Sequence, residues 1–296
     1  MRCLVSVPVP DPAVAHFGAE GMRRFPLSRA HISTVPSSVQ KVLATVGVPV
    51  HVIPYFEAPD AHESVPLGVF AGHRGGPRPL TEQEEWLRIG TDRLAHLCVR
   101  PDGAVQAVFL GTGEADMFAS TSVTTFNASL AVLDRQQAVI AAAPDLPAAA
   151  AAFRELNTEL REIDPSAFEA RESWWPRVLD DVRHTLNFPF SAAFEYVDAA
   201  GEKQIATEAT GPGRAHPEEL VWRSLASRGV APEQVRRVYC ELEACMMPGH
   251  YCAVWMQQTF PGAEFTHSFD YGMDAESRET GLKELITAAA QQARRQ

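Results

Sequence analysis

The sequence predicts an α+β domain followed by an α/β domain. The length of 296 residues corresponds to about two domains at roughly 150 residues each. Hydrophobic residues make up 46% and charged residues 21%, which is typical of folded proteins. From residue 188 onward the pattern changes to a hairpin followed by alternating strands and helices, in the order ββαβαβα. That order predicts a sheet with helices packed against its faces, a three-layer αβα domain over residues 188–296.

Short strands and helices alternate in the first domain, residues 1–187. Arg100-Pro-Asp-Gly103 separates two alternating segments and therefore indicates a hairpin. Phe153, Leu156 and Leu160 recur at helical spacing and predict a long helix. The expected strands cover 86–90, 94–99 and 105–110, and the expected helices cover 38–45, 124–133, 148–163 and 173–186.

The second domain, residues 188–296, begins with a predicted hairpin. Asp198 to Gly201 forms the turn between its two strands, and Pro217 suits the first turn of the helix that follows. The expected strands cover 190–197, 204–210, 235–242 and 264–269, and the expected helices cover 217–227, 250–258 and 275–294.

Composition and charge argue against several classes of protein. No stretch approaches the roughly 18 apolar residues of a membrane span. Pro8, Pro10 and Pro12 interrupt the N-terminus before a secretory apolar region could form, so we expect a cytoplasmic protein with no membrane partner. The net charge of −11 disfavours tight binding to a phosphate backbone, because each phosphate contact needs a cation.

The five cysteines are distributed unevenly. An odd number of cysteines without a signal peptide argues against a disulfide framework. Cys245 and Cys252 fall in a loop and near a predicted helix start, whereas Cys3, Cys98 and Cys240 are expected to be bystanders.

One histidine and two cysteines are predicted to meet where two helices begin. His216 immediately precedes the helix 217–227, and Cys252 begins or nearly begins the next helix. If these helices lie side by side on one face of the sheet, His216, Cys245 and Cys252 converge. One imidazole and two thiolates with an open fourth position are typical of a catalytic zinc site, where zinc lowers the pKa of a bound water to about 7. Glu218 is then placed to act as a general base.

Other residues near this cluster leave alternatives open. His250 is a competing ligand, and Cys240 is a weaker one because it is expected in the middle of a strand. Glu219 is expected to be a solvated residue of the first helical turn. Glu241 and Glu243 flank the cysteine loop, and either a contact to a metal ligand or a solvated strand end suits them.

His216-x-Glu218 followed by Cys245 and Cys252 resembles the signature of zinc-dependent nucleobase deaminases. The segments HPEELVWRSL and VYCELEACMMPGHYCAVWMQQTFPGAEFTHSFDYG resemble the bacterial nucleic acid/nucleotide deaminase domains of polymorphic toxin systems, which have a cytidine-deaminase-like fold. This resemblance implies that His216, Cys245 and Cys252 bind Zn²⁺ and that Glu218 shuttles the proton. It further implies deamination of a base, cytosine before adenine, in a nucleotide or a single-stranded nucleic acid.

The cysteine motif departs from the family pattern. The usual Pro-Cys-x-x-Cys is replaced by Ala244-Cys245, and the next cysteine, Cys252, stands seven residues further on. Four extra residues looped out around Pro248 and Gly249 would still let Cys252 reach the metal. The alternative is a catalytically degenerate deaminase-like domain in an immunity or binding protein. A fifth strand, common in this superfamily, has no candidate segment.

His267, Phe269 and Tyr271 are candidate substrate-binding residues. They close the strand 264–269 near the expected mouth of the pocket, where a base could stack on an aromatic ring.

The first domain resembles the SUKH immunity-protein superfamily, fourth subgroup, over about residues 25–186. The resemblance is carried by PSSVQKVLATVGVPV, IPYF, WLRIGTDRLAHLCVRPDGAVQAVFL and MFASTSVTTFNASL. It implies a protein that binds and neutralises a toxin. The fusion of the two domains adds the alternative that the first domain restrains or targets the deaminase domain in cis.

Overall fold

The chain has a mixed α/β architecture with two compact units in a computed structural model. The structure describes residues 11–25, 35–60, 65–187 and 189–294. The first unit comprises Met1–Arg135 and Thr158–Ala167, and the second comprises Gln136–Asn157 and Phe168–Gln296. Cys3 lies outside the described residues. The predicted boundary after residue 187 stays a prediction, whereas the compact unit that contains the deaminase-like motif starts earlier.

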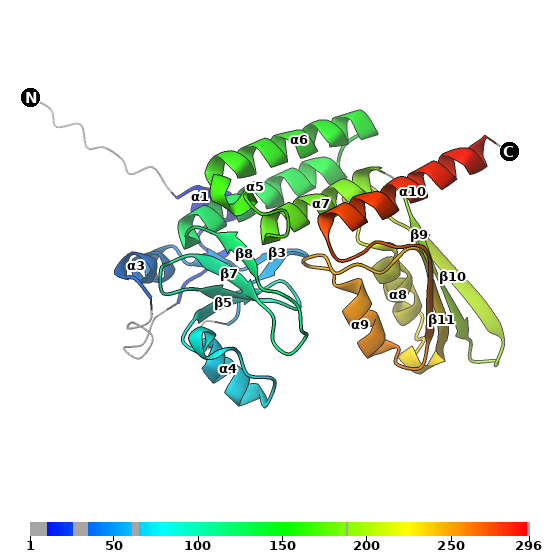
Figure 1. Ribbon diagram of the computed structural model, residues 1–296, viewed down its shortest axis with the longest axis horizontal. Helices are drawn as coiled ribbons and strands as arrows, with labels where there is room; N and C mark the ends of the chain where they lie inside the picture. The colour runs from blue at the N-terminus through cyan, green and yellow to red at the C-terminus, as the bar shows by residue number, and fades with distance from the viewer. Residues whose placement is uncertain (1–10, 26–34, 61–64, 188, 295–296) are drawn as a thin grey trace, which may run out of the picture. The chain divides into compact units, whose positions relative to one another are not determined.

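A six-stranded antiparallel sheet organises the first unit (Figure 1). Its strands, in spatial order, are β3 (His51–Val52), β4 (Phe56–Glu57), β5 (Leu87–Thr91), β6 (His96–Val99), β7 (Val105–Val108) and β8 (Met117–Ser120). The strands expected at 86–90, 94–99 and 105–110 are confirmed as β5, β6 and β7. The predicted hairpin joins β6 to β7, and its Gly103 has a φ of +93°, which glycine adopts readily.

Helices flank this sheet in the sequence. They are α1 (Pro12–Phe17), α3 (Ser37–Thr45), α4 (Leu67–Arg74), α5 (Val123–Ala141) and α6 (Leu146–Ile163), while β1 (Met22–Arg23) pairs with β2 (Val48–Pro49). The helices expected at 38–45, 124–133 and 148–163 are confirmed, although α5 continues to Ala141. Buried Leu133 and Ile140 show why, because the apolar face of α5 extends beyond the segment in which the pattern was recognised.

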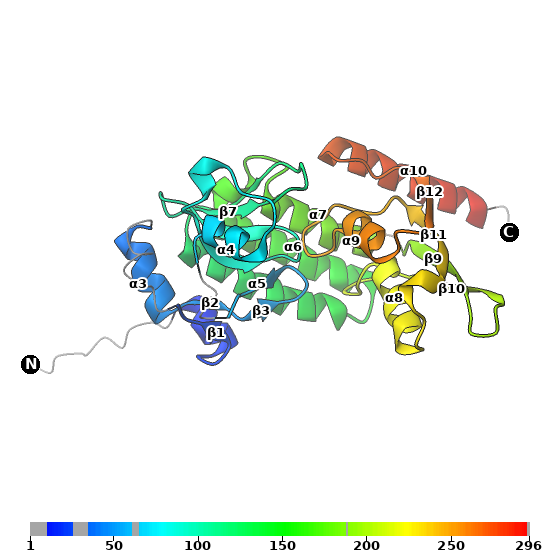
Figure 2. The same ribbon diagram turned by 90° about the horizontal axis from the view of Figure 1, so that it is seen from below.

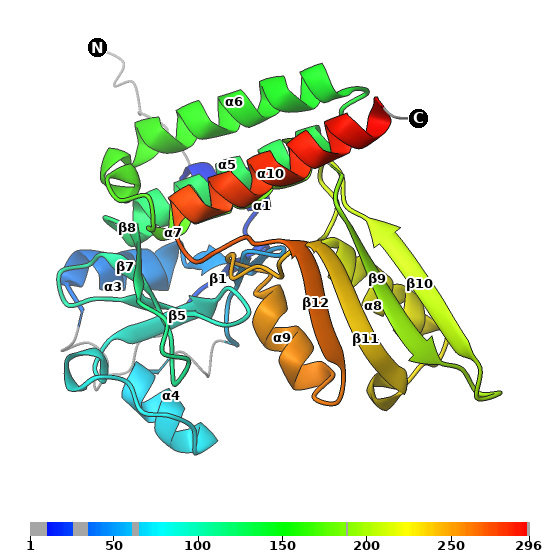
Figure 3. The same ribbon diagram turned by 45° about the vertical axis from the view of Figure 1, so that its right-hand side comes forward.

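The second unit contains a four-stranded sheet in the order β10-β9-β11-β12 (Figure 3). Its strands are β9 (Ser191–Val197), β10 (Lys203–Ala209), β11 (Val235–Leu242) and β12 (Glu264–Phe269). β9 pairs antiparallel with β10 and β11, whereas β11 and β12 are parallel. Because β11 and β12 are parallel, their carboxyl ends at Leu242 and Phe269 lie on the same edge of the sheet.

Two helices of this unit begin near that edge. They are α8 (Pro217–Ser227) and α9 (Cys252–Thr259), and they lie side by side (Figure 2). The rings of Trp222 and Phe260 make an edge-on contact between them, with 4.9 Å between centroids. α10 (Ala275–Ala293) contacts β11 and β12. The predicted order ββαβαβα is therefore observed. A three-layer cytidine-deaminase-like arrangement stays a prediction.

α7 (Trp174–Asn187), the helix predicted at 173–186, belongs to the second unit. Asp180 pairs with Arg278 of α10 at 3.5 Å, and the Arg177 guanidinium donates to the Met246 carbonyl at 3.5 Å. This helix therefore contacts α10 and the loop between β11 and α9, both of which follow it in the sequence. Among the described helices, none combines the length and apolar character needed to cross a membrane.

His96 in the first unit is partly buried in a cationic environment. Arg88 Nε donates to His96 Nδ1 at 3.2 Å, and the Phe70 ring contacts the imidazole at 4.9 Å between centroids. Burial, together with the positive charges of Arg88 and Arg74, lowers the pKa of His96 to about 4. The folded chain therefore holds this imidazole neutral.

We expect His96 to make the stability of the first unit depend on pH. Between about pH 6.5 and pH 4 the unfolded state binds the proton that the folded state excludes, so stability falls as pH decreases, by up to about 3 kcal/mol. His96→Gln, whose amide oxygen can still accept from Arg88, should flatten that part of the profile. Denaturant unfolding between pH 4 and 7.5 measures this, with exposed His73→Gln as control. Equal profiles for His96→Gln and wild type would contradict the assignment.

Candidate functional site

His216 is fixed at the N-terminal boundary of α8. It is the N-cap residue with extended backbone (φ −62°, ψ 148°), and Pro217 occupies the first helical position, where its missing N–H is harmless. The His216 side chain is almost fully buried. Its ring makes an edge-on contact with the Phe190 ring, with 6.2 Å between the two centroids. The local sequence therefore fixes the backbone position of His216, and packing in the core of the second unit fixes the direction of its side chain.

The loop between β11 and α9 brings two cysteines to the same place. His250 and Tyr251 donate their backbone N–H groups to the Met247 carbonyl at 3.1 and 3.0 Å, so the four extra residues wind into a turn. Gly249 adopts a φ of +78° in this turn. The Ala253 N–H then donates to the Cys245 carbonyl at 3.1 Å, which holds that loop against the start of α9, where Cys252 stands.

His216, Cys245 and Cys252 form a compact buried triangle. Nδ1 of His216 lies 3.4 Å from the Cys245 sulfur and 3.5 Å from the Cys252 sulfur. Tetrahedral zinc with its usual bonds to nitrogen and sulfur separates such atoms by about 3.5 Å. Two thiolates and one imidazole also form a donor set that binds Zn²⁺ in preference to hard cations such as Mg²⁺ or Ca²⁺. The residues present therefore fit a zinc ion.

The pKa values of the two thiols are shifted in opposite directions. Burial alone would raise the pKa of Cys245, but a hydrogen bond from Cys252 and the charge of His216 outweigh it and hold this pKa well below its usual value. Burial and the neighbouring Cys245 thiolate raise the pKa of Cys252. Burial alone would lower the pKa of His216, but the Cys245 thiolate and Asp181 raise it. The Cys245 thiolate and the His216 imidazolium thus stabilise each other's charged forms.

Glu218 lies in the first turn of α8, two residues after His216. Its side chain is 2% exposed, and within the described part of the chain its Oε2 atom has no hydrogen-bond partner. The Cys240 thiol donates to the carboxylate, and burial raises the pKa of Glu218. A buried carboxyl oxygen free of protein partners beside a metal-type cluster suits a group that accepts and returns a proton.

The cavity at this cluster is small. Its volume is about 10 Å³, close to the space of one water molecule. α7 contributes Asp181 and His184 to its wall, and Nδ1 of His184 hydrogen-bonds the Tyr271 hydroxyl. Burial lowers the pKa of His184 to about 3. The remaining lining residues are Phe190, His216, Glu218, Leu242, Glu243 and Cys245.

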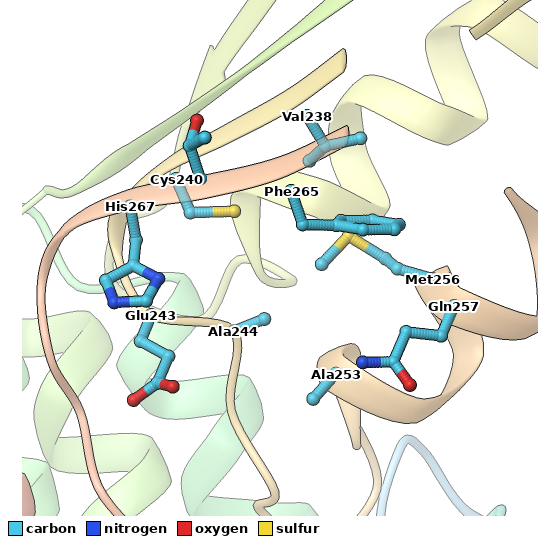
Figure 4. A pocket seen from close by; sticks show the side chains of 10 residues that line it. Val238, Cys240, Glu243, Ala244, Ala253, Met256, Gln257, Phe265 and His267 are labelled. Carbon is cyan, nitrogen blue, oxygen red and sulfur yellow. The ribbon is translucent and has the colours of Figure 1, made fainter. Parts of the chain in front are cut away.

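A larger pocket of about 220 Å³ lies next to it, between β11, β12 and α9 (Figure 4). Figure 4 shows the Phe265 ring beside the Met256 side chain, with Cys240 and His267 from neighbouring strands on the same side. Glu243 lines both cavities. The lining residues are Val238, Cys240, Glu243, Ala244, Ala253, Met256, Gln257, Phe265, Thr266 and His267.

The three candidate substrate-binding residues lie in different places. His267 lines the larger pocket and pairs with Asp270 at 2.9 Å, whereas Tyr271 lines the small cavity at the cluster. Phe269 is half-buried and packs against the hydrophobic core. Their role in substrate binding stays a prediction.

Sequence reasoning missed the carboxylates around the cluster. Asp181 of α7 accepts from His216, and Glu219 is buried against His250 rather than solvated. His250 contacts two carboxylates, so its ring nitrogens do not face the thiols. Asp181, His216 and His250 could also group around a metal, but the Nδ1 atom of His216 already faces both sulfurs. An acidic residue on an amphipathic helix, such as Asp181 on α7 or Glu219 on α8, gives no local sequence signal that it contacts a distant histidine.

The two glutamates that flank the cysteine loop bind backbone N–H groups. Glu243 Oε2 accepts from Tyr271 and Gly272 at 2.9 and 3.1 Å, so it joins the end of β11 to the loop after β12. Glu241 Oε2 accepts from the backbone of Ser191 at 2.6 Å.

Comparison with known families finds two matches along the chain. The model of the SUKH-4 immunity proteins matches residues 10–181, which is more than half of the chain. The model of the Xanthomonas-like deaminases matches residues 189–288. No curated protein and no solved structure matches the chain. The two families expected from the sequence are therefore confirmed.

We expect the triangle to bind one divalent metal ion such as Zn²⁺ per chain. Cys245→Ser and Cys252→Ser should each lose most of it, because each replaces a soft sulfur ligand by a weak hydroxyl. Cys98→Ser is the matched control, since Cys98 is a buried free cysteine outside the triangle. Elemental analysis after dialysis measures the ratio. Retention of full metal content in Cys245→Ser or Cys252→Ser would exclude that residue as a ligand.

Proposed function

Because the chain belongs to the SUKH-4 immunity protein family through residues 10–181 and carries a deaminase-family domain over residues 189–288, we propose a zinc-dependent deaminase of a toxin and immunity system. The reaction is hydrolytic replacement of the exocyclic amine of a nucleobase, cytosine before adenine. The substrate is a nucleotide or a single-stranded nucleic acid. The fold proposed for residues 188–296 is cytidine-deaminase-like.

The juxtaposition of Glu218 with the His216–Cys245–Cys252 triangle carries this proposal. His216 Nδ1 and the two sulfurs would hold the zinc ion, which when bound lowers the pKa of a water molecule toward neutrality. The free oxygen of Glu218 takes a proton from the attacking water and returns it to the leaving amine. A carbon–oxygen bond forms, the carbon–nitrogen bond breaks, and ammonia leaves.

Access to Glu218 requires the wall of the small cavity to open. A volume of about 10 Å³ holds a water molecule and not a base. His184 and Tyr271 close the cavity through their hydrogen bond, so a substrate reaches the carboxylate after that contact separates.

The closed cavity also favours a second candidate, a binding protein of the immunity type whose deaminase-like half has no turnover. In this alternative the SUKH-4 domain binds a toxin or an intramolecular partner, and the metal cluster is a structural centre. The two candidates differ in one observable, turnover of a base by the metal-loaded chain.

We expect Glu218→Gln to reduce deamination by at least about 100-fold while the metal content stays unchanged, because the amide cannot carry the proton. The assay follows uracil or inosine formation from single-stranded DNA, RNA and free nucleotides. Glu233→Gln, an exposed glutamate on another element, is the matched control and should keep full activity. Full activity of Glu218→Gln would contradict its role, and zinc-loaded wild type without turnover on any of these substrates would favour the binding protein.

A further inference from the structure

His216 uses its two ring nitrogens in opposite directions. Nδ1 faces the sulfurs of Cys245 and Cys252, while Nε2 lies 3.0 Å from Oδ1 of Asp181 on α7. The Asp181 carboxylate is 2% exposed and contacts the rings of both His216 and His250. A carboxylate at Nε2 accepts the proton of that nitrogen. Nδ1, which faces the thiols, is then the nitrogen that would bind a metal after losing its own proton.

Asp181 is itself held on both oxygens. Its Oδ2 lies 3.2 Å from Nε2 of His250, and Nδ1 of His250 lies 3.0 Å from Oε2 of Glu219. The rings of His216 and His250 stack in parallel, with 3.8 Å between centroids and 4° between planes. All four side chains are nearly fully buried. Each therefore has a fixed orientation, and His250 fixes a carboxylate instead of presenting a nitrogen to the metal.

We infer that Asp181 is the positioning residue of the metal site, with His250 and Glu219 as its support, and that α7 is consequently part of the deaminase unit. The inference rests on the proposed metal binding by His216, Cys245 and Cys252. Asp181 does not touch the reacting atoms. It sets the tautomer and the orientation of His216, and so determines how tightly the three ligands hold the ion.

This inference moves the functional start of the deaminase unit. The deaminase-family match begins at residue 189, but Asp181 lies before it, on a helix that the compact second unit includes. Residues 189–296 alone therefore contain every proposed ligand and lack the group that orients one of them.

The test is a titration of the metal-free full-length chain with Co²⁺, followed by competition with Zn²⁺ for a chelating indicator. Asp181→Ala should weaken metal affinity by about 10- to 100-fold. Asp181→Asn should weaken it less, because the amide oxygen still accepts from His216 Nε2. Asp180→Asn is the matched control, since Asp180 is the neighbouring acid on the same helix and pairs with Arg183 and Arg278 instead. Its affinity should stay within about twofold of wild type.

His250→Gln separates support from ligation. The Co²⁺ complex of this variant should keep the visible absorption of a tetrahedral site with two thiolates, because His250 is not a ligand. Loss of that absorption would make His250 a ligand and overturn the inference.

Wild-type affinity in Asp181→Ala and Asp181→Asn overturns the inference while the proposed function stands. Equal losses in Asp181→Asn and Asp180→Asn show general destabilisation and also overturn it. If Asp181→Ala does not fold by circular dichroism, the comparison of Asp181→Asn with Asp180→Asn decides. A wild-type chain that binds neither Co²⁺ nor Zn²⁺ removes the proposed function and this inference together.

Discussion

The second unit depends on one imidazole that bonds to sulfur on one side and to a carboxylate on the other. Burying an ionised group costs several kcal/mol unless an opposite charge lies against it. His216 is that opposite charge for the Cys245 thiolate and, together with His250, for Asp181. Three segments far apart in the sequence, α7, the start of α8 and the loop before α9, therefore have to meet. A metal ion bound to His216, Cys245 and Cys252 would displace the proton of His216 Nδ1 and the proton shared by the two thiols.

Sequence reasoning worked where a signal is local. Pro217 predicted the first turn of α8, and the alternating pattern of 235–242 predicted β11 with the bounds that the structure shows. The helix expected at 250–258 begins later, at Cys252, because Tyr251 adopts a φ of +45° and so cannot continue a helix backward. With these elements correct, the assumption that the helices 217–227 and 250–258 lie side by side was enough to bring His216 and the two cysteines together.

The carboxylates around the cluster could not be predicted in the same way. Asp181 stands 35 residues before His216, on a helix that sequence reasoning assigned to the first domain. Glu219 has the sequence context of a solvated helix residue, and only the turn at Met247–Tyr251 brings His250 against it. The extra residues that raised doubt about the cysteine spacing thus supply the histidine that supports Asp181. Long-range pairs of this kind leave no periodicity to detect.

The division of the chain into two families and its division into two compact units do not coincide. The SUKH-4 match ends at residue 181, whereas the second compact unit already includes the chain from Phe168. α7 therefore spans the end of one family match while its side chains serve the other family's site. In the proposed site, a change on this helix would act on the orientation of His216 through Asp181 and on closure of the cavity through His184. A displacement of α7 would then alter both metal affinity and substrate access.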